Sequence, residues 1–309
     1  MIYKKKKNAA SELRLDLVSN DWVVIAANRA KRPGNLEKTN CPFCGHDKII
    51  SVLNDFPTFS PADNLNERFE GPNGVMDGIG FHEVVIYPDH YRDLHQFSAE
   101  EMKEMIDIFQ QRYLDLIDKK FIKYVSIFHN HGKEAGASVI HPHSQIIAIP
   151  VIDPQLRGSI EGAENFYIKN KKCVYCVMIE WDKKDGQRIV YENEKFVVLC
   201  PFASQSNFEV RIYPKEHRPY FEKITEEEKT FFVDALKVAL YKIYKGLNDS
   251  AYNFYFHTAP RLEQKSEHYH WHLVILPKTS IYAGFEFCAG MEVSTIAPEK
   301  AAEFLREIL

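Results

Sequence analysis

The sequence lacks the features that mark membrane proteins and general nucleic-acid-binding proteins. No apolar run in its 309 residues approaches the roughly 18 consecutive apolar residues that span a bilayer. Neither sign of charge is in large excess, because 39 Lys and Arg residues stand against 43 Asp and Glu residues and leave a formal charge of −4. This balance argues against a surface that is basic overall, although a local basic pocket is compatible with it. We expect a protein that binds neither a membrane nor nucleic acid.

Cysteine is scarce, and its placement bears on both the compartment and the chemistry. Four of the six cysteines form two tight pairs, Cys41 with Cys44 and Cys173 with Cys176. The lysines at 4–7 are followed by small and polar residues instead of the apolar core of a secretory signal, so we expect a cytoplasmic chain. In that reducing compartment, cysteine pairs with this spacing indicate metal binding before disulfide formation.

What the sequence does contain is an internal repeat with an offset of 127 residues. The segment His141–Gln145 (His-Pro-His-Ser-Gln) is matched by His268–His272 (His-Tyr-His-Trp-His), and His90 is matched by His217. Eight residues after each of those two single histidines stands a Ser or Thr that is followed three positions later by Glu. This is the capping-box pattern that begins a helix. We interpret the chain as a duplication.

Each repeat predicts the same order of elements: a strand, a long helix and two further strands. Hairpins with few parallel crossovers predict an α+β fold of two tandem histidine-triad-like modules, each an antiparallel sheet with a long helix packed on it. We place the modules at 1–160 and 161–309, because the stretch between the repeats is rich in breakers and lysine. The predicted elements are 81–87, 98–118, 124–129 and 144–149 in the first repeat, and 206–213, 225–247, 253–257 and 271–276 in the second.

Each repeat also holds the ligands for one tetrahedral metal site. The cysteine pair supplies two thiolates from one turn, and two histidines 51 residues apart supply two imidazoles. We assign zinc, about two ions per chain, with His46 as a competing ligand in the first site. Four protein ligands leave no open position, so both sites are predicted to be structural. The two sets are Cys41, Cys44, His90 and His141, and Cys173, Cys176, His217 and His268.

The repeats differ in the loop that precedes the histidine cluster. In the first repeat, Asn130, Gly136 and Ser138 combine polar donors with a small residue that lets the backbone approach a phosphate. At the same offsets the second repeat has a histidine, a glutamate and a lysine. A carboxylate and a long lysine do not suit a phosphate cradle. The first repeat is therefore predicted to carry the chemistry, and the second to be a structural copy.

His143 is the predicted nucleophile. Residues 141, 143 and 145 alternate along a strand and point to one face, and with His141 assigned to metal, His143 is available to attack phosphorus. Imidazole is a good nucleophile and a good leaving group, which suits a two-step nucleotidyl transfer through a phosphoramidate. Gln145 can bond a phosphate oxygen but cannot relay protons as a histidine would. This favours transfer to a phosphate acceptor over hydrolysis.

These motifs resemble the galactose-1-phosphate uridylyltransferase family, the transferase branch of the histidine-triad superfamily, over almost the whole chain. The segments 29–33 and 54–57 resemble the family's phosphate-contacting arginines and its uridine and ribose contact. The resemblance implies that His143 is the uridylylated residue and Gln145 its phosphate partner. The second metal site resembles a two-zinc subgroup that also includes ADP-glucose phosphorylases. The residues implied to bind nucleotide or phosphate are Arg29, Arg32, Asn54, Asp55, Asn130, Gly136 and Ser138.

The resemblance continues into the C-terminal segment. Residues 282–286 resemble the family's hexose-phosphate region, which implies that Phe285 and Glu286 contact the sugar. Where the family usually continues with Gly-(Ser/Thr)-Gly, this chain has Cys-Ala-Gly at 288–290. The implied substrates are a UDP-sugar and a hexose 1-phosphate, exchanged by a ping-pong reaction of galactose metabolism. The implied assembly is a homodimer.

Other functions make different demands on the same residues. A phosphorylase would use the same loop to transfer an adenylyl group from ADP-glucose or a dinucleoside polyphosphate to phosphate. A zinc-stabilised nucleotide binder without activity predicts the loss of His143 or Gln145, and both are present. A histidine-triad hydrolase predicts His at position 145. The uridylyltransferase is the leading hypothesis, and the phosphorylase is the alternative that these residues leave open.

Overall fold

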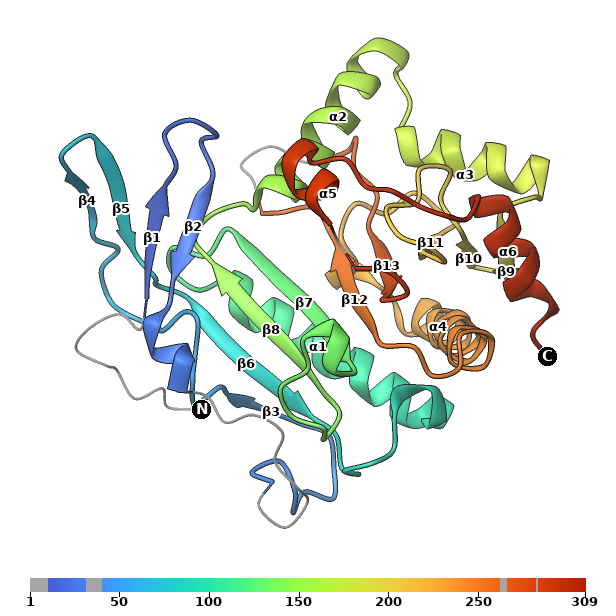
Figure 1. Cartoon of the computed structure of the whole chain (residues 1–309), viewed down its shortest axis with the longest axis horizontal. Helices are drawn as coiled ribbons and strands as arrows, with labels where there is room; N and C mark the ends of the chain where they lie inside the picture. Colours follow the sequence, from blue (N-terminus) through green and yellow to red (C-terminus); the bar gives the residue numbers. More distant parts are fainter. Residues whose placement is uncertain (1–10, 32–40, 262–265, 282) are drawn as a thin grey trace.

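The computed structural model of the chain describes residues 11–31, 41–261, 266–281 and 283–309. Figure 1 shows a long sheet that crosses the molecule. It has nine antiparallel strands among the described residues. In spatial order they are β3 (Ile50–Leu53), β6 (Phe81–Ile86), β8 (His143–Ile149), β7 (Tyr124–His131), β12 (Tyr252–His257), β13 (His272–Pro277), β11 (Val210–Pro214), β10 (Phe196–Leu199) and β9 (Ile189–Glu192).

The nine-stranded sheet consists of two equivalent halves joined edge to edge. The order β3-β6-β8-β7 of the first half is repeated in reverse as β12-β13-β11-β10, with β9 added outside. The halves meet where β7 pairs with β12, so that Asn130 lies opposite Asn253. The predicted α+β class with antiparallel sheets is confirmed, and the duplication builds one continuous sheet across both halves.

One long helix from each half packs on the same face of this sheet. Both helices begin at the predicted capping boxes: Ser98 accepts a hydrogen bond from the backbone N–H of Glu101 in α1, and Thr225 from that of Glu228 in α4. Their apolar faces form the main core with the back of the sheet. The helices are α1 (Ala99–Ile117), α2 (Pro154–Asn170), α3 (Val174–Asp185), α4 (Glu226–Gly246), α5 (Gly284–Ala289) and α6 (Pro298–Glu307).

The opposite face of the sheet is covered in the second half and open in the first. Helices α2 and α3 pack on Val197, Leu199 and Tyr213 of β10 and β11 and form a second core. On the first half, a small sheet of β2 (Trp22–Ile25), β1 (Glu12–Leu15), β5 (Asn73–Asp77) and β4 (Glu67–Glu70) covers only the end of β8 (Figure 1). The rest of that face is left for a cavity.

One predicted strand begins clearly later than the sequence indicated. The strand predicted at 206–213 begins only at Val210, because Phe208 has a positive φ of 59° and the backbone N–H of Glu209 donates to the carbonyl of Ser206 in a turn. The proposed division at 160/161 falls inside α2, which begins with Asp153 as N-cap and proline at its first turn. Among the described residues, no helix combines the length and the apolar character needed to cross a membrane.

Candidate active site and two metal-binding clusters

The first predicted ligand set comes together as one cluster. The Sγ of Cys44 lies 3.3 Å from Nδ1 of His90 and 3.6 Å from Nδ1 of His141, and the Sγ of Cys41 lies 3.6 Å from Nδ1 of His141. All four ligand atoms lie within 4.8 Å of one another. The competing candidate, His46, lines the neighbouring cavity instead. The predicted set of four is confirmed as a cluster that could hold a metal ion.

The second cluster corrects one predicted ligand. It consists of Cys173, Cys176, His217 and His270, so the prediction of His268 was wrong. The Sγ of Cys176 lies 3.4 Å from Nδ1 of His217 and 3.5 Å from Nδ1 of His270. The buried Nε2 of His268 has no hydrogen-bond partner in the described part of the chain.

The error came from carrying a constant offset through a loop of different length. The strands set the true equivalence, because β8 begins at His143 and β13 begins at His272. His272 therefore matches His143, and His270 matches His141, with an offset of 129. The loop before the strand is two residues longer in the second half, which moves the ligand from the first histidine of its cluster to the second.

Both clusters fit a tetrahedral ion. Metal–sulfur bonds of about 2.3 Å and metal–nitrogen bonds of about 2.0–2.1 Å place sulfur and nitrogen about 3.5 Å apart. The observed Sγ–Nδ1 distances are 3.3–3.6 Å. In each cluster the Nε2–H of one histidine donates to a backbone carbonyl, from His141 to Tyr87 at 2.6 Å and from His270 to Pro214 at 2.9 Å. This bond leaves Nδ1 as the ligand atom.

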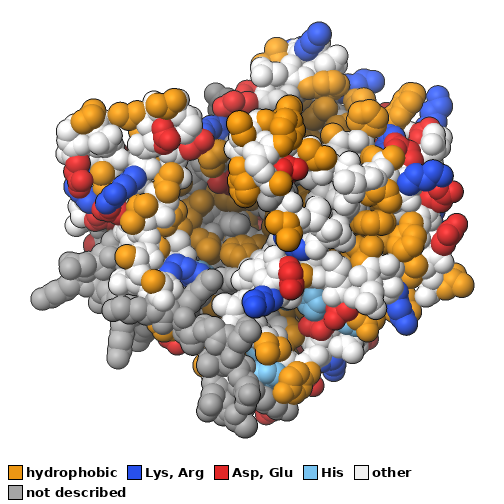
Figure 2. All heavy atoms as spheres, viewed as in Figure 1, with side chains coloured by type: hydrophobic (Ala, Val, Ile, Leu, Met, Phe, Trp, Pro, Cys, Tyr) orange, Lys and Arg blue, Asp and Glu red, His pale blue; other side chains and the backbone are white. Residues whose placement is uncertain are grey.

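A cavity of about 560 Å³ opens beside the first cluster, on the face of β3, β6 and β8, and no residue of α1 to α6 lines it. Figure 2 shows this face of the molecule hollowed between the β1–β2 hairpin and α5, with hydrophobic atoms at the base of the hollow. The cavity brings together most of the predicted site. Of the predicted residues, its lining includes Arg29, Asn54, Asp55, Asn130, Gly136, Ser138, His143 and Gln145. Arg32 lies outside the described residues.

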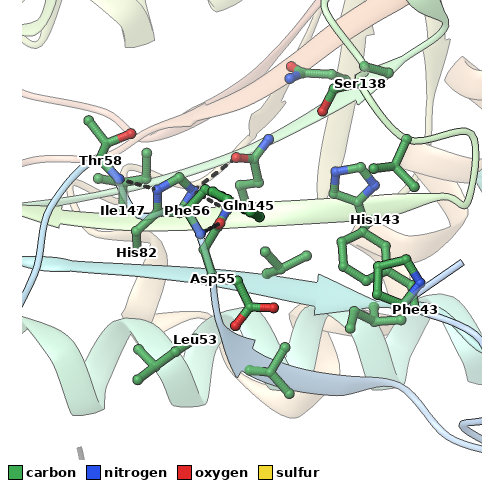
Figure 3. A pocket seen from close by; sticks show the side chains of 18 of the residues that line it. Phe43, Leu53, Asp55, Phe56, Thr58, His82, Ser138, His143, Gln145 and Ile147 are labelled. Atoms are coloured by element: carbon green, nitrogen blue, oxygen red, sulfur yellow. Dashed lines mark hydrogen bonds between the residues drawn. The ribbon is translucent and has the colours of Figure 1, made fainter. Parts of the chain in front are cut away.

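His143 has the form of a nucleophile. Its Nδ1–H donates to the backbone carbonyl of His141 at 2.8 Å, so the neutral ring carries its lone pair on Nε2. Burial lowers the pKa of His143 and favours this neutral form. The ring of Phe43, which lies between the two cysteines of the first cluster, packs against it with a centroid distance of 5.1 Å (Figure 3). The first cluster thus supplies both the carbonyl and the ring that orient His143.

Gln145 is held by His82. The backbone N–H of Thr58 donates to Nδ1 of His82 at 3.0 Å, which leaves the ring proton on Nε2. That Nε2–H donates to Oε1 of Gln145 at 2.9 Å, as the dashed lines of Figure 3 show. Burial lowers the pKa of His82 to about 4, so the ring is neutral at pH 7. Because its oxygen is engaged, Gln145 offers its NH2 group to the side of the cavity where Ser138 and His143 lie.

Two glycines shape the loop that precedes Ser138. Gly136 has a φ of 85°, in the left-handed region that favours glycine. Gly132 has a φ of 81°, and a Cβ there would lie 2.6 Å from the Cβ of Ala251 in the second half. The loop therefore depends on glycine at one position for its conformation and at the other for close packing as well.

The segment after β3 forms the other wall of the cavity. The guanidinium of Arg29 donates to the backbone carbonyl of Phe56 at 2.7 Å, and Oδ1 of Asn54 accepts from the backbone N–H of Phe56 at 2.8 Å. These bonds fold the segment so that Asp55 lines the cavity (Figure 3). A carboxylate in this place can accept hydrogen bonds from the hydroxyls of a sugar.

The two predicted sugar contacts do not line this cavity. Phe285 and Glu286 belong to α5 and are not among its lining residues. The ring of Phe285 is 53% exposed, and the carboxylate of Glu286 accepts a hydrogen bond from the backbone N–H of Ala283 at 3.0 Å. Their contact with a sugar stays a prediction.

Comparison with known proteins agrees with this geometry. Residues 25–152 match the N-terminal domain of a family described as a domain of unknown function (DUF4931), and residues 183–279 match the HIT domain. A galactose-1-phosphate uridylyltransferase of Thermotoga maritima is 33% identical over 96% of this chain and 98% of its own length. An ADP-glucose phosphorylase of Arabidopsis thaliana is 31% identical over 98% of this chain and 94% of its own.

A solved structure of a uridylyltransferase is also similar, with a TM-score of 0.85 and 26% identity over 96% of this chain and 97% of that one. The chain belongs to the galactose-1-phosphate uridylyltransferase family. The family resemblance inferred from the histidine cluster, the loop before it and the cysteine pairs is therefore confirmed.

In this member of the uridylyltransferase family, sequence reasoning missed His82. A signal for it existed in the strand alternation. Val84 pairs with Gln145 and Ile86 with His143, so the alternate residue His82 shares the face of the two predicted active residues. A histidine on this otherwise apolar side of β6 could have been recognised once β6 was paired with β8.

Proposed function

We propose that this protein is a UDP-glucose–hexose-1-phosphate uridylyltransferase, which exchanges UMP between UDP-glucose and galactose 1-phosphate. The observation that carries the proposal is the state of His143. Its Nδ1–H is fixed on a carbonyl, its Nε2 carries the lone pair, and it lies in a cavity lined by the amide of Gln145 and the hydroxyl of Ser138. These groups suit attack on a phosphorus atom.

The reaction has two half-reactions. In the first, Nε2 of His143 attacks the α-phosphorus of UDP-glucose, the phosphorus–nitrogen bond forms, and the bond to the bridging oxygen breaks to release glucose 1-phosphate. The His141 carbonyl stabilises the positive charge that develops on the ring, and Gln145 donates to a phosphate oxygen. In the second, a phosphate oxygen of galactose 1-phosphate attacks phosphorus. The phosphorus–nitrogen bond breaks, which yields UDP-galactose and returns His143.

The remaining lining residues have roles in binding. The loop residues bind the phosphates, the arginines balance their charge, and the segment after β3 holds uridine and ribose. We assign residues 1–160 to the catalytic module and 161–309 to a structural and substrate-contacting module. The roles are phosphate binding for Asn130, Gly136, Ser138, Arg29 and Arg32, uridine and ribose binding for Asn54 and Asp55, and sugar binding for Phe285 and Glu286.

The metal, the compartment and the assembly belong to the same proposal. Two thiolates with two imidazoles are a donor set typical of structural zinc, so we assign about two zinc ions per chain. None of the six cysteines is in a disulfide bond, which supports a cytoplasmic location. Ile281, which precedes α5, and Phe287, which lies within it, are 94% and 77% exposed, and this supports a homodimer that covers the segment.

The donor half-reaction tests the function directly. Enzyme mixed with UDP-glucose alone should release glucose 1-phosphate in a burst of at most one equivalent per site. The peptide that contains His143 should gain the mass of a uridylyl group, which is labile in acid and stable in base. Labelling by ADP-glucose alone, followed by release of ADP on adding phosphate, would identify the phosphorylase instead. Failure of UDP-glucose, ADP-glucose and a dinucleoside polyphosphate to label the protein would overturn nucleotidyl transfer.

A further inference from the structure

We propose that Asn253, in the second half of the sheet, is a positioning residue for nucleotidyl transfer because it holds the phosphate-binding loop of the first half. The inference rests on the proposed function, since it assumes that Asn130 and the loop at 132–138 contact the transferred phosphate. It assigns a task in the reaction to the half of the molecule without the nucleophile.

The contact uses both hydrogens of one side-chain amide. Nδ2 of Asn253 donates to Oδ1 of Asn130 at 2.8 Å and to the backbone carbonyl of Ala135 at 2.8 Å. Asn253 reaches both because β12 pairs with β7 and sets it directly opposite Asn130. One side chain of the second half therefore ties the start of the loop to its middle.

These two bonds determine what the loop offers to a phosphate. With Oδ1 of Asn130 engaged by Asn253, the NH2 group of Asn130 is left to face the cavity that it lines. The fixed carbonyl of Ala135 also sets the peptide that leads into Gly136. Donors that are fixed before the substrate arrives lose less entropy in the transition state than mobile ones.

Neighbouring contacts seat the base of the loop on the same stretch of the second half. The ring of His131 stacks on Tyr252 with a centroid distance of 4.9 Å, and its Nε2 lies 3.0 Å from the carboxylate of Asp249. Gly132 approaches Ala251 too closely for any side chain. The loop is thus built against residues 249–253, and Asn253 is the member that reaches a cavity-lining side chain.

The first test compares two asparagines of the second half. Asn253→Ala should lower the rate of labelling by UDP-glucose about 10- to 100-fold, with KM for the donor changed much less. Asn253→Asp should lose more, because a carboxylate has no hydrogen for either oxygen. The control is Asn193→Ala, whose Nδ2 also donates twice, to the carbonyl of Phe231 at 2.7 Å and to Asp234 at 2.8 Å. It should leave the labelling rate unchanged.

A double-mutant cycle shows whether Asn253 acts through Asn130. If it does, Asn130→Ala together with Asn253→Ala should label little more slowly than the slower single variant. If the losses in labelling rate of the two single variants multiply in the double variant, Asn253 does not act through Asn130. Metal content and the urea midpoint of each variant show whether the fold is kept.

The outcomes separate this inference from the proposed function. If UDP-glucose labels the wild-type protein and the Asn253→Ala variant equally fast, the positioning role is overturned and the proposed function still holds. Wild type that labels with neither UDP-glucose nor ADP-glucose would overturn the function and the catalytic role of the contact with it. Hydrogen exchange still tests the contact itself. Peptide 132–138 should exchange faster in Asn253→Ala than in Asn193→Ala, and equal exchange would show that Asn253 does not hold the loop.

Discussion

The two halves of the sheet carry equivalent clusters of metal ligands beside equivalent buried histidines, yet it is the histidine of the first half that lines the cavity of about 560 Å³. His272 repeats the arrangement of His143: its Nδ1–H donates to the carbonyl of His270 at 3.1 Å, and Tyr175, from between two cysteines, packs on it at 5.3 Å. The histidine and its cluster are therefore not what makes a half active.

The difference lies in the residues that share the face of the histidine. In the first half, Val84 and Ile86 of β6 line the cavity. The register of β6 with β8, compared with that of β11 with β13, shows that the equivalent residues of the second half are Arg211 and Tyr213. The ring of Tyr213 lies 4.8 Å from that of His272, and α3 covers the site from outside. Small apolar residues thus leave room for a substrate where large ones fill the space.

The largest expected effect concerns the two equivalent histidines, His143 and His272. His143→Asn should abolish labelling by a nucleotide donor, because it removes the Nε2 lone pair that is proposed to attack phosphorus. His272→Asn should keep the burst, since His272 is only 2% exposed and is not among the residues that line the cavity of His143. Mass spectrometry of the labelled peptides measures both. Label on the peptide of His272 would reverse the assignment of the halves.

A second effect separates the two metal clusters. Cys41→Ser and Cys173→Ser should each remove about one metal equivalent. Cys41→Ser should also slow labelling about 10- to 100-fold, because the first cluster holds the carbonyl and the Phe43 ring that orient His143. Cys173→Ser should lower the melting temperature with little change in labelling per folded molecule. If both variants slow labelling equally, the first cluster has no special role in orienting His143.

A smaller effect is expected from exchanging the residues that fill or leave open the space beside each histidine. Ile86→Tyr places the ring of the second half beside His143 and should raise KM for the donor about 10-fold by filling the cavity. The reciprocal Tyr213→Ile should cost about 2–4 kcal/mol of stability from the cavity that it leaves, and should not make His272 react. An unchanged KM in Ile86→Tyr would mean that the size of the side chain at this position of β6 does not control binding of the donor.

The comparison also explains which parts of the molecule could be predicted from the sequence. The capping boxes of Ser98 and Thr225 and the strands follow from local patterns, which depend on near neighbours in the chain, and the first ligand set follows from the internal repeat. His268 was misassigned because the loop before the strand differs in length between the two halves. Unlike the alternation of a strand, a difference in loop length produces no periodic pattern in the sequence. His82 and Asn253 act through pairing between strands far apart in the sequence, so their contacts became visible only with the sheet.

The last expected effect is on the pH dependence of stability and concerns two turns that occupy equivalent places, one before each long helix. In the first half, His95 stacks on Tyr244 with a centroid distance of 3.7 Å. The second half has Glu222 at the matching position, and its buried Oε2 has no hydrogen-bond partner within the described residues. Burial raises the pKa of Glu222 from 4.5 to about 7. The second half therefore carries a pH-dependent cost of folding.

The sign of that cost follows from linkage. Because the folded pKa of Glu222 lies above the unfolded one, folding favours the protonated carboxyl. Its stabilising contribution is full below about pH 4.5 and is lost as the pH rises through about 7. Glu222→Gln keeps a neutral group at every pH and should be more stable than wild type by up to about 3 kcal/mol at pH 8, with a much smaller difference at pH 5. Urea unfolding of metal-loaded protein at both pH values measures this, with exposed Glu164→Gln as the control. A difference between Glu222→Gln and wild type that is the same at both pH values would show that Glu222 is already ionised in the folded protein.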